Sequence, residues 1–222
     1  MNDAEGAAGA PTGYLAIPES GSGPGVLVLH AWWGLTPFFR SVCDRFAAAG
    51  FVAFAPDLNK GKIARTIEEA EELNSERNVE ETRTTLLRAL EYVQQLPAVN
   101  RAGLGVVGWS LGAFWTIRLS TMVPDAMRAG VLFYGTGAAD FGQAQAAFLG
   151  HFAEQDPWEP LEDVRQMEMA MRRAGVELTL HMYPEVGHWF FEDDRPEHYD
   201  PDAAALAWQR TIEFLRTHLS GA

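Results

Sequence analysis

Residues 105–115, GVVGWSLGAFW, place one serine between two glycines, where a short apolar run gives way to a helical pattern. The run predicts a buried strand that ends at Gly108, and an apolar-faced helix follows it. The small residues Gly108 and Gly112 permit a sharp turn that leaves the Ser110 hydroxyl exposed. Two interpretations are open at this point: Ser110 is a nucleophile presented by the turn, or it is the N-cap of the helix.

Length and composition restrict both the fold and the partners. A chain of 222 residues, 47% of them hydrophobic, is long enough for one core and short for two ordinary domains. We therefore expect a flexible tail over residues 1–12 and a single domain over residues 13–222. A net charge of −13 argues against nucleic-acid and anionic-membrane surfaces, because those need clustered Lys and Arg. The tail does not read as a secretory signal, and no apolar run is long enough to span a membrane. The single cysteine excludes an internal disulfide. We therefore expect a cytoplasmic protein.

Short apolar runs alternate with helical patterns along the chain. Each run predicts a strand buried on both faces, and the runs cover residues 25–30, 51–55, 103–108, 129–134, 146–153 and 177–183. Between and after them, helices are predicted from Pro37 to the Gly50 stop, from Thr66 through Val93 with a break near Asn74, after Ser110, over 161–171, and from Pro201 to Leu219. Strands alternating with crossover helices predict an α/β fold: a three-layer α/β/α sandwich with a mostly parallel twisted sheet. In such a fold the ligand site lies at the carboxyl ends of the strands.

A serine hydroxyl becomes a nucleophile only with a general base and an acid that orients the base. After a strand–serine–helix turn of this kind, the acid and then the histidine follow in the chain. Asp156 and His188 have that order, and each lies just beyond a predicted strand. Glu154 and Asp140 are weaker alternatives for the acid, because Glu154 is too near the strand interior and Asp140 follows a different strand. The sequence therefore predicts a catalytic triad of Ser110, Asp156 and His188.

The same chemistry needs backbone N–H groups directed at the developing oxyanion. We expect one from Leu111, directly after the serine, and one from Trp32 in the loop after the strand over residues 25–30. His30 is expected to be a buried histidine bonded to backbone, and Cys43, on the apolar face of its helix, is expected to lie in the core. The chain has no CxxC or HExxH motif, and we expect no metal site.

With these residues placed, the chain resembles the dienelactone hydrolase family of the α/β-hydrolase superfamily, from about Gly13 to Leu219. The landmarks follow in family order: HAWWGL, FVAFAPDL, VGWSLGA, HFAEQDPWEP and YPEVGHWFF. The resemblance implies an α/β-hydrolase fold without a large lid, and hydrolysis of small carboxylic esters, lactones or thioesters through an acyl-enzyme. It also implies that the reaction needs no cofactor. Family members that open dienelactone have cysteine where this chain has Ser110, glutamate where it has Ala31, and arginine where it has Glu192. These departures argue against dienelactone itself as the substrate.

Aromatic residues gather around the proposed catalytic positions. We expect the substrate pocket to be lined by Trp33, Trp109, Trp158, Trp189 and Glu192. The alternative, strongest for Trp109, is that large aromatic rings simply fill the core. Glu192 and the net charge of −13 favour neutral esters over carboxylated ones.

Three questions stay open. Lys60, Lys62 and Arg65 follow a predicted strand and would offset the negative field if they face the substrate, whereas solvated loop cations would not. A non-catalytic or single-turnover receptor for small ligands is the competing function on this fold. A scaffold that uses the acidic helix near residues 67–81 rests on charge alone. The expected partner is a small-molecule ester or lactone, and the expected assembly is a monomer or homodimer.

Overall fold

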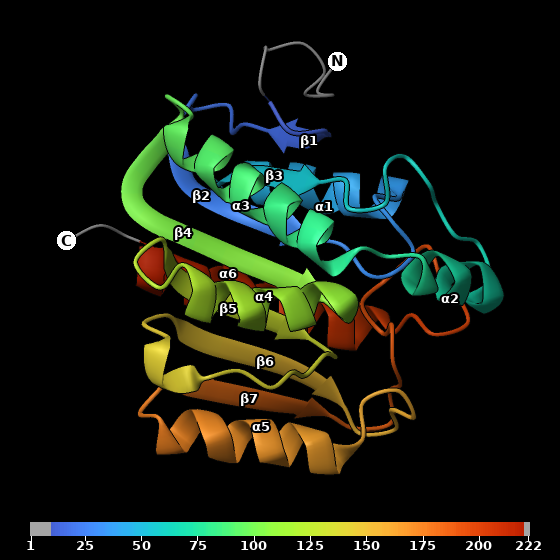
Figure 1. Cartoon of the computed structure of the whole chain (residues 1–222). Helices are drawn as coiled ribbons and strands as arrows, with labels where there is room; N and C mark the ends of the chain where they lie inside the picture. Colours follow the sequence, from blue (N-terminus) through green and yellow to red (C-terminus); the bar gives the residue numbers. More distant parts are fainter. Residues whose placement is uncertain (1–9, 220–222) are drawn as a thin grey trace. The chain divides into compact units, whose positions relative to one another are not determined.

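The computed structural model describes residues 10–219, which form two compact units that meet in the chain between Leu104 and Gly105. Of the expected N-terminal tail, residues 1–9 lie outside the described residues. Strand β4 (Val99–Trp109) begins in the first unit and ends in the second. Both units consist of strands with helices on both faces (Figure 1).

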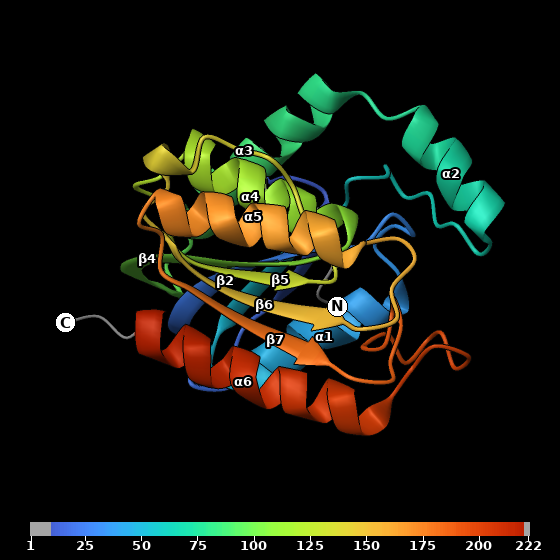
Figure 2. The same ribbon diagram turned by 90° about the horizontal axis from the view of Figure 1, so that it is seen from below.

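The first unit contains three further strands and three helices. They are β1 (Gly13–Ala16), β2 (Gly23–Leu29), α1 (Pro37–Ala48), β3 (Val52–Pro56), α2 (Ile67–Ser75) and α3 (Val79–Gln95). The strand order is β1-β3-β2. Strands β2 and β3 are parallel, and β1 pairs with β3 in the antiparallel direction. Helices α1 and α3 lie on opposite faces of β2 and β3 (Figure 2).

Local sequence signals explain the helix boundaries of this unit. Thr66 caps α2, because its side chain accepts a hydrogen bond from the Glu69 N–H at 3.3 Å. The Glu69 carboxylate accepts one from the N–H of Arg65, the residue before the cap, so the expected capping box forms only in part. The predicted break near Asn74 is confirmed, because α2 ends at Ser75 and Asn78 caps α3. Cys43 is fully buried, which confirms its place in the core.

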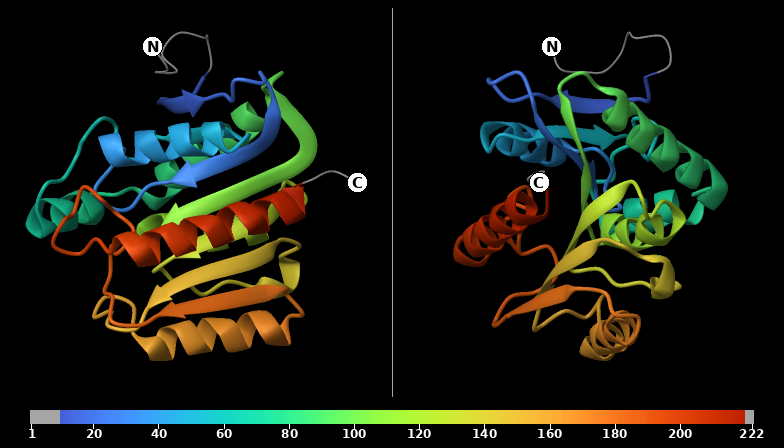
Figure 3. Two further views of the ribbon diagram at one scale, coloured as in Figure 1. Left: turned by 180° about the vertical axis from the view of Figure 1, so that it is seen from behind. Right: turned by 90° about the vertical axis from the view of Figure 1, so that its left-hand side faces the viewer.

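The second unit carries the remaining elements in an alternating order. They are α4 (Leu111–Met122), β5 (Met127–Phe133), the 3₁₀ helix η1 (Phe141–Gln143), β6 (Ala147–Ala153), α5 (Leu161–Arg173), β7 (Leu178–Tyr183) and α6 (Pro201–Leu219). The strand order is β4-β5-β6-β7. Strands β5, β6 and β7 are parallel, so the segments that follow them emerge at one edge. Helices α4 and α5 cover one face and α6 the other (Figures 2 and 3).

The expected fold class is confirmed: the chain has a mostly parallel sheet flanked by helices. Two details differ from the sequence prediction. Strand β1 was not predicted, because GYLA is only four residues long and lies at the end of the strand order. Strand β7 is not buried on both faces, since it lies at the other end of the strand order and Met182 is 43% exposed. Within residues 10–219, no helix combines the length and apolarity needed to cross a bilayer.

Candidate active site

Ser110 occupies a strained turn between β4 and α4. Its backbone has φ 51° and ψ −112°, and its N–H donates to the Phe133 carbonyl at 2.9 Å. A Cβ at Gly108 would lie 2.2 Å from the Gly112 backbone, so only glycine fits there. The Ser110 side chain makes no capping hydrogen bond to α4. The hydroxyl is therefore free of the N-cap role that the sequence left open.

The structure brings Ser110, His188 and Asp156 together within the second unit. His188 Nε2 lies 3.1 Å from Ser110 Oγ, and His188 Nδ1 lies 2.7 Å from Asp156 Oδ2. The side chains of His188 and Asp156 are 4% and 2% exposed. The three side chains form a continuous chain of hydrogen bonds from carboxylate to imidazole to hydroxyl.

Backbone donors fix the orientation of Asp156. Its Oδ1 accepts hydrogen bonds from the N–H groups of Trp158 and Glu159 at 2.9 and 3.0 Å, which leaves Oδ2 for the imidazole. The Glu159 side chain in turn accepts a hydrogen bond from Thr136 at 2.7 Å, and burial raises the pKa of Glu159 to about 7. The two alternative acids, Glu154 and Asp140, are exposed, and Asp156 is the residue bonded to His188 Nδ1.

The two expected oxyanion donors lie in different units. Leu111 is the first residue of α4, and the N–H groups of a first helical turn have no partner within the helix. Trp32 lies in the first unit, in the loop after β2, where its carbonyl accepts a hydrogen bond from Asn59 Nδ2 at 3.2 Å. The assignment of both donors remains a prediction.

His30, in the same loop, is bonded to backbone. Its Nδ1 lies 2.6 Å from the Ala31 carbonyl, and its Nε2 accepts from the Leu58 N–H at 3.1 Å. Burial lowers the pKa of His30 to about 4. The expectation of a buried, backbone-bonded histidine is confirmed.

The tryptophans expected in the pocket differ sharply in exposure. Trp33 and Trp109 are 1% and 0% exposed, and Trp109 stacks on Phe133 with ring centroids 4.8 Å apart. These contacts favour the core-filling alternative for Trp109. Trp158 is 43% exposed and lies 6.5 Å from the His188 ring, and the buried Trp189 packs beside both. Of these four tryptophans, Trp158 alone has a large exposed surface.

Glu192 lies where the sequence did not place it. It was expected to be a charge that faces the substrate, but its side chain has no exposed surface. The Tyr134 hydroxyl donates to Glu192 Oε1 at 2.8 Å, and burial raises the pKa of Glu192 to about 8. Tyr134, which was not among the predicted site residues, also packs its ring on His188 at 4.7 Å. Its only signal in the sequence is its position as the last residue of the apolar run over 129–134, directly after β5.

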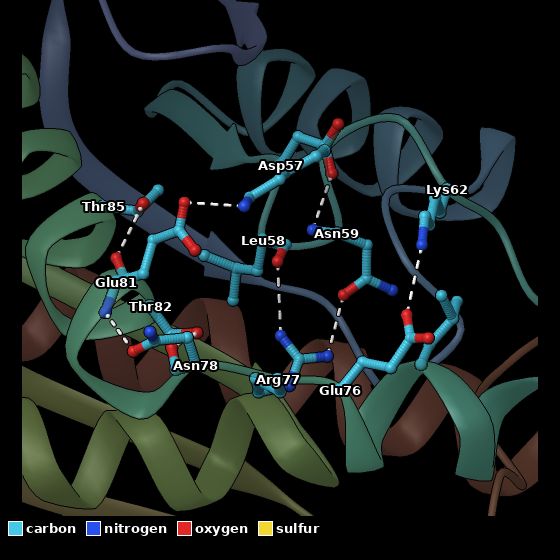
Figure 4. Close-up of a pocket in the computed structure, with 12 residues that line it drawn as sticks. Asp57, Leu58, Asn59, Lys62, Glu76, Arg77, Asn78, Glu81, Thr82 and Thr85 are labelled. Atoms are coloured by element: carbon cyan, nitrogen blue, oxygen red, sulfur yellow. Dashed lines mark hydrogen bonds and ion pairs between the residues drawn. The ribbon is translucent and has the colours of Figure 1, made fainter.

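The two lysines of the β3–α2 loop are paired with acids of the first unit. Lys60 lies 2.7 Å from Glu81. Lys62 lies 3.3 Å from Glu76, as Figure 4 shows. These residues line a small pocket of about 150 Å³ with Arg77, which donates to the Leu58 carbonyl and to Asn59. The lysine side chains are 71% and 63% exposed, as expected of solvated loop cations.

The sequence profile of the dienelactone hydrolase family matches residues 12–219. The chain belongs to the dienelactone hydrolase family. It is therefore an enzyme of the dienelactone hydrolase type. Among the described residues, no group of three or more His, Cys, Asp or Glu side chains could hold a metal ion.

Several members and neighbours of the dienelactone hydrolase family resemble the chain over nearly its whole length. Protein usf of Aquifex pyrophilus is 31% identical, covering 94% of both chains. A protein of Aquifex aeolicus, provisionally named a carboxymethylenebutenolidase, is 30% identical and covers 93% of both. The crystal structure of a dienelactone hydrolase-like promiscuous phosphotriesterase from metagenomic libraries aligns with a TM-score of 0.83 at 22% identity, covering 93% of this chain and 92% of that one. At that identity the last comparison shows the fold alone.

Proposed function

We propose that this enzyme hydrolyses small carboxylic esters, lactones or thioesters through an acyl-enzyme on Ser110. The observation that carries the proposal is the hydrogen-bonded chain from Asp156 through His188 to the Ser110 hydroxyl, with distances of 2.7 and 3.1 Å. An oriented base beside a serine is the arrangement that nucleophilic catalysis requires.

The hydrogen bonds assign each group a role. If Nδ1–H of His188 donates to Asp156, the unprotonated Nε2 accepts the Ser110 proton while Oγ attacks the carbonyl carbon. The imidazolium, stabilised by Asp156, then donates that proton to the leaving alkoxide or thiolate, and the acyl group remains on Oγ. Water attacks the acyl carbon in the second half, and its proton passes to Nε2 and then back to Oγ.

Charge develops on the carbonyl oxygen in both halves of this reaction. We propose that the Leu111 N–H binds that oxygen and lowers the barrier by about 3 kcal/mol, and the Trp32 N–H stays a prediction from the sequence. The Ser110, Ala31 and Glu192 departures from dienelactone-opening relatives support a neutral ester, lactone or thioester rather than dienelactone.

Turnover of a series of p-nitrophenyl esters of increasing acyl length, by wild type beside Ser110→Ala, tests this proposal. Ser110→Ala should abolish turnover without unfolding, because it removes one oxygen at an existing turn. Ser120→Ala is a matched control, since Ser120 lies in α4 with its hydroxyl bonded to the Ile117 carbonyl. Full activity in pure, folded Ser110→Ala would refute the proposal, and a burst without later turnover in wild type would indicate a single-turnover receptor instead.

A further inference from the structure

A buried acid lies close behind the catalytic histidine. Glu192 follows His188 by four residues, is 0% exposed, and receives the hydrogen bond from Tyr134. The charged groups that face it are Asp194 and Arg195, whose Nε is 3.8 Å from Glu192 Oε2. A carboxyl group is costly to bury unless it is hydrogen-bonded, so the hydrogen bond from Tyr134 is the interaction that keeps Glu192 in this position.

His188 and Glu192 are carried by the same tight turn. Trp189, directly after the histidine, has φ 67°, a conformation that residues other than glycine rarely adopt. The Glu192 N–H donates to the Trp189 carbonyl at 2.9 Å and closes the turn. The backbone that carries the imidazole and the backbone that carries Glu192 are therefore joined in one hydrogen-bonded turn.

Tyr134 connects this turn to the end of β5. It is also at positive φ, 36°, and its N–H donates to the His151 carbonyl in β6 at 2.8 Å. Its ring lies 4.7 Å from the His188 ring, tilted by 55°, while its hydroxyl binds Glu192. One side chain thus contacts both the imidazole ring and the acid that lies in the histidine's turn. Strained residues persist where the surroundings hold them firmly, and here they flank the catalytic base.

We propose that Glu192, acting through Tyr134, is a positioning residue for His188, and that the pair holds the imidazole plane between Asp156 and Ser110. The inference rests on the proposed function, because it assigns the pair a role in that reaction. Hydrogen bonds hold the imidazole at Nδ1 and Nε2. The Tyr134 ring then restricts rotation of the imidazole out of the plane that these two bonds define.

A double-mutant cycle on kcat tests the inference. Tyr134→Phe and Glu192→Met each remove one half of the hydrogen bond with little change in volume. Each should lower kcat for a p-nitrophenyl ester on the order of tenfold to a hundredfold while KM stays within about twofold, since a displaced base slows chemistry and not binding. The double variant should lose no more than the worse single variant. Glu192→Gln keeps the acceptor oxygen and should restore kcat to within about threefold of wild type.

Tyr183→Phe is the matched control for loss of a buried hydroxyl. The Tyr183 hydroxyl lies 2.9 Å from His151 Nδ1 in the same unit, so this variant should lower stability while leaving kcat unchanged. If Ser110→Ala is inactive but Tyr134→Phe and Glu192→Met keep wild-type kcat, the positioning role is overturned and the proposed function stands. If Ser110→Ala retains activity, the proposed function itself fails.

Discussion

Replacing Asp156 with asparagine preserves the size of the side chain and reverses one hydrogen bond. Oδ1 accepts from two backbone N–H groups at 2.9 and 3.0 Å, so the amide oxygen of the new side chain would take that place. The amide NH₂ would then point at His188 Nδ1, which lies 2.7 Å from Oδ2 in wild type. A donor at that position favours the tautomer with the proton on Nε2, facing Ser110. The imidazole would then be unable to accept the serine proton.

The expected loss follows from that tautomer. A histidine held in the wrong tautomer should lower kcat by about 10⁴-fold, or ~5.5 kcal/mol of transition-state stabilisation. KM should change little, because Asp156 is 2% exposed and contacts the histidine and backbone groups. Folding should be nearly unaffected, since the amide oxygen retains both backbone hydrogen bonds.

Steady-state hydrolysis of p-nitrophenyl acetate by purified Asp156→Asn measures the loss, with circular dichroism to verify the fold. Glu154→Gln is the matched control, because Glu154 is the exposed acid that the sequence left as an alternative, and it should keep full activity. A kcat for Asp156→Asn within about tenfold of wild type would refute the orienting role of Asp156. A large loss in Glu154→Gln would transfer that role to Glu154.

Two further predictions concern the surroundings of the triad. Trp158→Ala should raise KM for phenyl esters about tenfold more than for methyl esters, because the exposed ring that would bind the phenyl group is lost. The kcat should not change, because the Trp158 backbone N–H still donates to Asp156. Equal KM changes for both esters would contradict this prediction. Burial raises the pKa of Glu192 from 4.5 to about 8. Between these pH values the folded chain keeps a proton that the unfolded chain releases, so the free energy of unfolding falls by about 1.4 kcal/mol for each pH unit as the pH rises. Glu192→Gln should therefore raise Tm more at about pH 8.5 than at about pH 5 by calorimetry, and an equal shift at both would show that Glu192 does not titrate in this window.

Periodicity and turn residues were sufficient to predict most of the fold. The six apolar runs all became strands, and the helices that follow the Thr66 cap and the Pro37 start begin at the expected residues. Strand β4 extends back to Val99, before the apolar run begins, because backbone pairing and not side-chain hydrophobicity defines a strand. Strand β1 could not be predicted from the sequence, because its four residues have no distinctive pattern.

The site was predictable where chain order carried the information. Ser110, Asp156 and His188 each follow a strand, and parallel pairing brings such positions to one edge. The part of the site that was not predicted depends on which side chains are buried. Nothing in the sequence shows that Glu192 is fully enclosed or that Tyr134 donates to it, because both depend on how segments 58 residues apart pack.

Covalent labelling with a fluorophosphonate, mapped by mass spectrometry of the digested protein, tests the activated serine directly. A phosphonyl group stays on the oxygen that attacks it, so the label marks the nucleophile without any assumption about the substrate. We expect a single adduct on the peptide that contains Ser110, no adduct in Ser110→Ala, and much slower labelling in His188→Ala. Folded wild type that stays unlabelled, or a label that persists in Ser110→Ala, would contradict the claim that Ser110 is the nucleophile.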